Sequence, residues 1–168
     1  MKKIICLVLT LVMAACLAAC TENTPSTEPS APAAALDGFV FTYQGTQIPI
    51  HADAAPILQV LGEPKNYTEE TSCAFSGLDK TYYFGSFYLK TYPIEDKDYV
   101  FGLWFADDSV SSDEGLYIGM PEAQAKEICG EDSYNGTNAY IQTRNGTKLT
   151  VIIQDGVVFS VQYEAIVN

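Results

Sequence analysis

The chain has 168 residues, of which 48% are hydrophobic, and its 21 acidic and 9 basic residues give a formal net charge of −12 at pH 7. This excess of acidic residues argues against nucleic-acid binding and against electrostatic binding of anionic lipid by a polybasic segment, because both need clustered Lys and Arg side chains. We therefore expect no nucleic-acid partner.

The first segment has the organisation of a secretory leader. Lys2 and Lys3 precede an apolar run that is too short, and too near a small-residue site, to be a membrane span. The run ends in "LAAC" at residues 17–20, which resembles the lipobox of bacterial lipoproteins. The resemblance implies a signal peptide over 1–19 and a Cys20 that carries acyl chains such as palmitate. We therefore predict a protein anchored to the extracytoplasmic face of the cell membrane; an ordinary secretory leader would leave the compartment unchanged.

Residues 20–37 are rich in Thr, Pro, Ser and Ala and have no apolar period, which predicts a disordered tether. Residues 38–168 then form one domain of ordinary size. Two further cysteines, Cys73 and Cys129, belong to this domain. In an oxidising compartment we expect them to form a disulfide, worth about 4 kcal/mol in the chain-entropy model. The alternative is two separate thiols buried as small hydrophobic groups.

The domain begins with two short elements. Residues 39–50, "FVFTYQGTQIPI", alternate in polarity around Gln44-Gly45, which predicts a β-hairpin. Asp53 is placed to cap a short helix that ends at Leu61, where Gly62 stops it.

The rest of the chain contains a tandem repeat. Residues 52–64 match 119–132, and 99–105 match 157–163, with a hairpin between the matches in each half. Each unit, about 52–110 and about 119–165, then consists of a short helix and a three-stranded antiparallel meander, and the first carries an insertion around "SCAFSGLDK". We predict an α+β domain in which both units form one antiparallel sheet with the helices on one face, after an N-terminal hairpin.

The motif "YIGMPEAQAKEICGED" followed by a meander resembles the repeat unit of the BamE/SmpA and beta-lactamase-inhibitory-protein superfamily. In that inhibitor, two tandem units form one concave sheet that grips a protein partner. "SCAFSGLDKTYYF" and "DDSVSSDEGLYIGM" also resemble an uncharacterised group of lipoproteins from Gram-positive gut bacteria. The resemblance implies a protein partner, but no contact residue transfers to a position of this chain.

Strand periodicity predicts which side chains share a face of the sheet. The residues assigned to the core are Tyr99, Phe101, Leu103 and Phe105 in the first unit and Val157, Phe159, Val161 and Tyr163 in the second. The residues assigned to the other face are Val100, Gly102, Trp104, Val158, Ser160 and Gln162. A two-residue Gly85-Ser86 turn would pair Tyr83 with Tyr88. Tyr83, Tyr88, Tyr92 and Trp104 are therefore expected on the face away from the helices.

These four aromatic residues have two interpretations. They could stabilise an open sheet as cross-strand pairs, or lie beneath the N-terminal hairpin. They could instead form a recognition surface, because Tyr and Trp are frequent in interfaces. The second interpretation predicts a non-enzymatic protein-binding module. A glycan-binding surface protein and a structural scaffold of an envelope complex are the alternatives.

Residues suited to catalysis or to metal binding are sparse. His51 is the single histidine, and no catalytic or zinc motif accompanies it. The acidic clusters at 95–98, 107–108 and 113–114 do not have EF-hand spacing. We therefore expect no enzyme, no metal and no cofactor.

Overall fold

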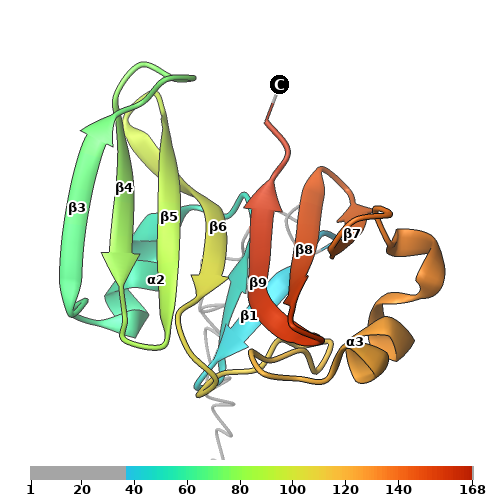
Figure 1. Ribbon diagram of the computed structural model, residues 1–168. Coiled ribbons are helices and arrows are strands. Elements are labelled where there is room, and N and C mark those ends of the chain that lie inside the picture. The colour runs from blue at the N-terminus through green and yellow to red at the C-terminus, as the bar shows by residue number, and fades with distance from the viewer. Residues whose placement is uncertain (1–36, 168) are drawn as a thin grey trace, which may run out of the picture.

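The computed structural model describes residues 37–167, so the predicted signal peptide, the lipid site Cys20 and the tether up to residue 36 lie outside the described residues. The described part has the predicted α+β fold (Figure 1). It contains a hairpin of β1 (Val40–Tyr43) and β2 (Thr46–Pro49), the helices α2 (Ala54–Leu61) and α3 (Glu122–Cys129), and a short 3-10 turn at Glu131–Ser133. The remaining strands are β3 (Asn66–Thr71), β4 (Leu78–Tyr83), β5 (Phe87–Ile94), β6 (Lys97–Phe105), β7 (Ala139–Arg144), β8 (Thr147–Gln154) and β9 (Val157–Ala165).

The two repeat units form one seven-stranded antiparallel sheet in the order β3-β4-β5-β6-β9-β8-β7. Each meander ends at the centre of the sheet, where β6 pairs with β9 through three residue pairs, Gly102–Glu164, Leu103–Tyr163 and Trp104–Gln162. The tandem architecture is thus confirmed. The first unit also has an edge strand, β3, that the sequence did not predict. Its six residues are all exposed, so no buried face imposes an apolar alternation on them.

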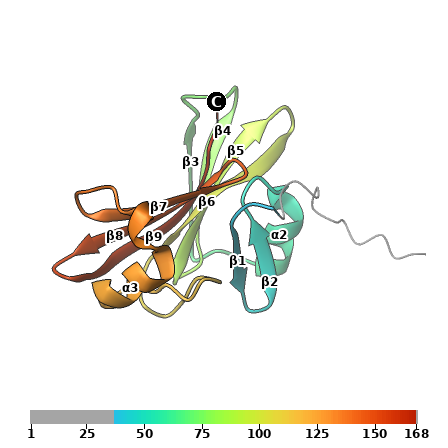
Figure 2. The same ribbon diagram turned by 90° about the vertical axis from the view of Figure 1, so that its right-hand side faces the viewer.

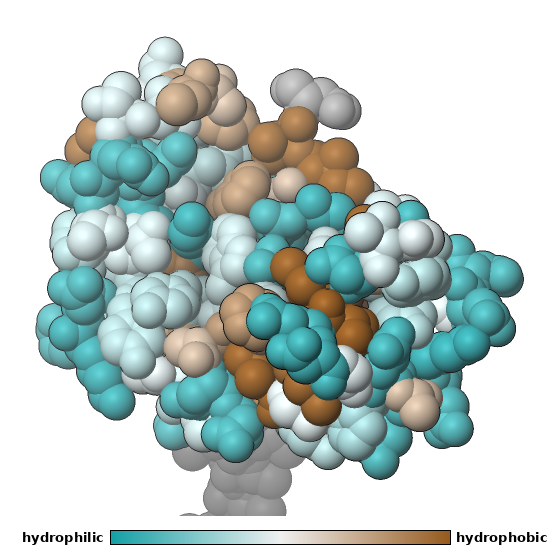
Figure 3. Space-filling view, in the orientation of Figure 1, coloured by the Kyte–Doolittle hydropathy of each residue, from teal (hydrophilic) through white to brown (hydrophobic). Residues whose placement is uncertain are grey.

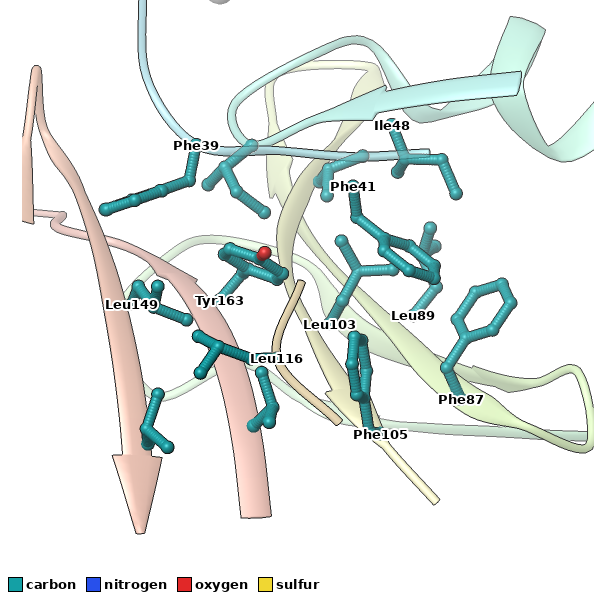
Figure 4. Packing of buried hydrophobic residues seen from close by; sticks show 14 of the residues in the cluster. Phe39, Phe41, Ile48, Phe87, Leu89, Leu103, Phe105, Leu116, Leu149 and Tyr163 are labelled. Carbon is teal, nitrogen blue, oxygen red and sulfur yellow. The ribbon is translucent and has the colours of Figure 1, made fainter. Parts of the chain in front are cut away.

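The helices and the β1–β2 hairpin pack on one face of the sheet: α2 and the hairpin lie behind it in Figure 1 and to its right in Figure 2, and α3 lies below β8 and β9 in Figure 2. Helix α2 packs against β2 and β6, whereas α3 packs against β7 and β9. The core between these layers includes Phe41 of the hairpin, whose ring lies 5.2 Å from the rings of both Phe87 and Phe105 (Figure 4). The hairpin therefore helps to cover the core face.

Local signals define both helices at their ends. The Asp53 side chain accepts a hydrogen bond of 3.1 Å from Ala55 N, as expected for the cap of α2. Gly62, at φ 76°, ends the helix, and Gly130, at φ 81°, ends α3 in the same way. The matched Gly-Glu pairs of the two units thus have the same structural role.

The predicted core alternation is correct at one end of each central strand and wrong at the other. Leu103, Phe105, Val161 and Tyr163 are buried. The reversal comes from two β-bulges, each of which inserts an unpaired residue. Lys90 pairs with Gly102 but Thr91 pairs with Val100, which leaves out Phe101. Ile152 pairs with Ser160 but Ile153 pairs with Val158, which leaves out Phe159.

A bulge reverses which face the following side chains occupy. Val100 and Val158, assigned to the outer face, are 0% and 1% exposed in the core. Phe159, assigned to the core, is 58% exposed. The other residues wrongly assigned to the core are Tyr99 and Phe101, which are half-buried, and Val157, which is exposed. Because the two bulges fall at matched positions of the repeat, they are a shared feature of its two copies.

Candidate binding face of the sheet

The Gly85-Ser86 turn aligns three aromatic residues across the first unit. Tyr83 pairs with Tyr88, as predicted, and Tyr88 pairs with Trp104. We call Tyr83, Tyr88 and Trp104 the aromatic row. Tyr88 is 39% exposed, and Tyr83 and Trp104 are half-buried. Tyr88 alternates along β5 with the core residues Phe87 and Leu89, which lie on the side of the β1–β2 hairpin, so the row lies on the opposite face and the hairpin does not cover it.

Neighbouring groups lie against one flat face of each tyrosine ring and against the Trp104 ring. The rings of Tyr83 and Tyr88 stack at 4.7 Å with an interplanar angle of 26°. The Phe101 ring stacks on Trp104 at 6.1 Å, and the Lys90 ammonium lies 4.5 Å from the centre of the Trp104 ring, a cation–π contact. The ring edges, the tyrosine hydroxyl groups and the second face of each tyrosine ring are therefore the parts of the row that can meet a second molecule.

Trp104 depends on a glycine beside it. A Cβ atom on Gly102 would lie 3.3 Å from Cη2 of Trp104 and 2.2 Å from the carbonyl oxygen of Tyr163. Gly102 thus allows β9 to approach β6 closely at the joint between the units. The glycine therefore supports both the sheet and the position of the indole ring.

Tyr92 does not belong to the row, which corrects the prediction for this residue. It is 5% exposed, because the β3–β4 connection folds over this end of the sheet and places the Phe75 ring 4.9 Å from the Tyr92 ring. Burial raises the pKa of the Tyr92 hydroxyl, so the group stays protonated at neutral pH. Strand alternation placed Tyr92 on the correct face of the sheet, but no local signal in the sequence indicated the segment that covers it.

His51 holds Tyr92 in place. Its Nε2 lies 2.9 Å from the Gly146 carbonyl oxygen and its Nδ1 lies 2.9 Å from the Tyr92 hydroxyl. Since a carbonyl can only accept, Nε2 carries the proton and donates it, and the hydroxyl of Tyr92 donates to Nδ1. Both ring nitrogens of His51 are thus engaged in structural hydrogen bonds.

The second unit continues the same face. Trp104 pairs with Gln162, Gln162 with Thr150, and Thr150 with Ile141, which is 38% exposed. Figure 3 shows apolar side chains in the middle of this face with polar ones around them. The sequence reading missed the exposed Phe159. A glycine inside a strand often marks a bulge, so Gly102 was the available signal, and the repeat match could have transferred it to the second unit.

The predicted disulfide is not formed, which corrects a second expectation. Both thiols are free: Cys73 is exposed in the β3–β4 connection, and Cys129 is buried at the end of α3. The insertion folds along one edge of the sheet, at the opposite side of the molecule from α3 in Figure 1. Burial raises the pKa of the Cys129 thiol to about 11, so it stays neutral and weakly nucleophilic.

Residues 37–167 contain no group of three or more His, Cys, Asp or Glu side chains arranged to hold a metal ion. None of the helices in this part of the chain is long and apolar enough to cross a membrane. Comparison of the chain with protein-family models, curated proteins and solved structures gives no match.

Proposed function

We propose that the domain is a non-enzymatic protein-binding module, held at the extracytoplasmic face of the cell membrane by acyl chains on Cys20. The observation that carries the proposal is the aromatic row, three rings side by side on a sheet face that neither the helices nor the hairpin covers. Tyr and Trp are enriched among the residues that dominate binding energies at protein interfaces. Lys90 and the Lys148–Glu164 ion pair, at 2.7 Å, supply polar groups beside the row.

The packing of the rings favours a protein partner over a glycan. Sugar rings stack on the free, flat face of an aromatic side chain. One face of Tyr83 is turned toward one face of Tyr88, and Phe101 and Lys90 lie against Trp104, so fewer ring faces are open to a sugar. A protein surface can instead pack against ring edges and accept or donate hydrogen bonds at the hydroxyl groups. A scaffold role within an envelope complex is a case of protein binding and would use the same face.

The test is site-specific photo-crosslinking of the full chain in its own membranes. A photoreactive residue at Gln162, the direct neighbour of Trp104 in the sheet, should give a discrete protein adduct. Tyr88→Ala and Trp104→Ala should each reduce its yield about tenfold or more, as expected for residues that dominate an interface. Tyr67→Ala is the matched control, because Tyr67 is 43% exposed but pairs with Tyr82 on the opposite face of the sheet.

Equal adduct yields from the row variants and the Tyr67→Ala control would contradict the proposal, and so would the absence of an adduct combined with binding to purified cell-wall glycan. The anchor has a separate test. Cys20→Ser should move the protein from the membrane fraction to the soluble fraction and abolish incorporation of labelled fatty acid. Membrane retention of this variant without label would reject the lipid anchor and leave the binding face untouched.

A further inference from the structure

The outer edge of β3 is an open border of the seven-stranded sheet. Strand β3 pairs only with β4, through six consecutive residue pairs without a bulge, and it forms the left border of the sheet in Figure 1. Within residues 37–167, no backbone hydrogen bond from outside this hairpin reaches β3. The other border, β7, is partly covered, because Tyr134 bridges to Tyr140 and Asn135 N donates a hydrogen bond of 2.8 Å to the Ala139 carbonyl oxygen. The two borders thus differ, and β3 is open to a further strand.

Alternate residues of β3 direct their backbone groups away from β4. In an antiparallel pair, every second residue exchanges hydrogen bonds with its partner, and the residues between them point their N–H and C=O groups to the other side. The Ser72 N–H donates to the Gly77 carbonyl oxygen at 3.0 Å, in continuation of the β3–β4 register, which sets the alternation. The residues whose groups point outward are Tyr67, Glu69 and Thr71. These groups form a template for the backbone of another strand.

The side chains of β3 determine which strand fits this template. Edge strands are usually protected by lysine, proline or a bulge, and β3, with the sequence NYTEET, has none of these. It carries Glu69 and Glu70, which are exposed and, as successive residues of a strand, lie on opposite faces. Glu69 accepts a hydrogen bond of 2.6 Å from Tyr67, and the lysine opposite it, Lys80, is bound to Asp98. Neither glutamate makes an ion pair within residues 37–167, so each face of the edge presents one carboxylate without a counter-charge.

We infer that the β3 edge binds an extended segment of a partner protein that carries two successive basic residues, as an additional strand of the sheet. The main chain of such a segment can form hydrogen bonds with the outward backbone groups. Its two basic side chains lie on opposite faces, so one can pair with Glu69 and the other with Glu70. The open backbone carries the inference, and the two glutamates select the occupant. The inference does not depend on the proposed partner of the aromatic row.

Charge and sequence disfavour the other two occupants of this edge. A second copy of the chain would bring the same two glutamates of each copy to the junction, and each copy has a net charge of −12. Residues 21–36 of the chain itself contain three prolines and no basic residue, so they lack both the N–H donors and the charge.

The test is calorimetric titration of the full chain, solubilised in detergent, with three end-blocked peptides. Thr-Val-Thr-Lys-Lys-Thr-Val-Thr should bind saturably. The same peptide with Glu-Glu in place of Lys-Lys should bind at least about tenfold more weakly, because both cross-strand pairs become repulsive. Thr-Pro-Thr-Lys-Lys-Thr-Pro-Thr keeps the charge but cannot complete the hydrogen-bonded ladder, and it should also bind at least about tenfold more weakly. Hydrogen–deuterium exchange locates the strand: the Lys-Lys peptide should slow exchange in residues 66–71 and leave β7 unchanged.

Charge-exchange variants distinguish this edge from general attraction to an acidic protein. Glu69→Lys combined with Glu70→Lys should weaken binding of the Lys-Lys peptide at least about tenfold and should bind the Glu-Glu peptide instead. Both residues are exposed, so the double variant should fold. Glu127→Lys combined with Asp132→Lys is the matched control. It makes the same change in net charge at exposed residues near α3, at the other side of the molecule in Figure 1, and should bind the Lys-Lys peptide like the wild type.

The outcomes separate this inference from the proposed function. Absence of saturable Lys-Lys peptide binding, equal binding of the proline peptide, or failure of the charge exchange to switch peptide preference would overturn the inference. Slowed exchange in residues 66–71 that increases with protein concentration, without peptide, would assign the edge to a second copy and overturn it as well. Tyr88→Ala and Trp104→Ala should leave peptide binding unchanged, so the result at the β3 edge does not decide the role of the aromatic row.

Discussion

Replacement of Gly102 by alanine tests the joint between the two repeat units. The new Cβ would lie 2.2 Å from the Tyr163 carbonyl oxygen, about 1 Å inside an ordinary C···O contact of about 3.3 Å. The Tyr163 carbonyl oxygen is a backbone atom of β9, so a side-chain rotation cannot relieve the clash. The strands β6 and β9 must separate, and only three residue pairs hold them together.

The expected loss of stability follows from this geometry. Overpacking costs about 1–3 kcal/mol, and each weakened backbone hydrogen bond adds about 1 kcal/mol. Alanine also restricts the unfolded chain, which offsets the loss by about 0.4–1 kcal/mol. We expect Gly102→Ala to lower the free energy of unfolding by about 2–4 kcal/mol, a large part of the roughly 5–15 kcal/mol of a typical domain.

Urea unfolding followed by circular dichroism measures this loss. The matched control is Ser160→Ala, because Ser160 occupies the position of Gly102 in the second unit and already has a Cβ. It loses only the bond of 2.9 Å from the Gln162 amide, so it should cost about 0.5–1 kcal/mol. A Gly102→Ala protein within about 0.5 kcal/mol of the wild type would refute the close approach of β9 to β6 on which this reasoning rests.

Three further predictions follow from burial and charge. Leu89→Ala should lower the free energy of unfolding by about 2–5 kcal/mol because Leu89 is fully buried. Tyr88→Ala, next to it on the open face, should lower it by no more than about 1 kcal/mol. Similar losses for the two variants in urea unfolding would contradict the assignment of these residues to opposite faces. Asp53→Ala should cost about 1 kcal/mol through loss of the helix cap. The hydrogen bond from Lys97 lowers the pKa of Asp53. The stability that the Asp53 carboxylate contributes is therefore present above the ordinary carboxyl pKa of about 3.9 and is lost as the pH falls through the lowered pKa. A difference in unfolding free energy between Asp53→Ala and the wild type that does not change in acid would contradict this. Cys129, with its pKa raised to about 11, should resist alkylation at pH 8 in the native protein and react after unfolding, as measured by peptide mass spectrometry; rapid native labelling would show that it is accessible.

Features that depend on a few neighbouring residues were predictable from the sequence. The Gly85-Ser86 turn determined the pairing of Tyr83 with Tyr88, because a two-residue turn leaves one register. Asp53 and Gly62 marked the ends of α2 through a side-chain cap and a positive φ angle. The repeat predicted the order of elements in both units, and two amphipathic meanders have to bury their apolar faces together.

Features that depend on distant contacts were decided only by the tertiary structure. The bulges at Phe101 and Phe159 follow from how β6 and β9 pair with their neighbours, and one unpaired residue moved Val100 and Val158 into the core. The β3–β4 connection covers Tyr92 because of where the insertion packs, and that packing also keeps the insertion apart from Cys129. Strand alternation is a rule of local backbone geometry, whereas an insertion that breaks the alternation, or a loop that covers a face, gains its free energy from residues far away in the chain. The sequence by itself therefore determined the helix and the three-stranded meander of each unit, whereas the tertiary structure added the edge strand β3 and decided which aromatic side chains remain on the open face.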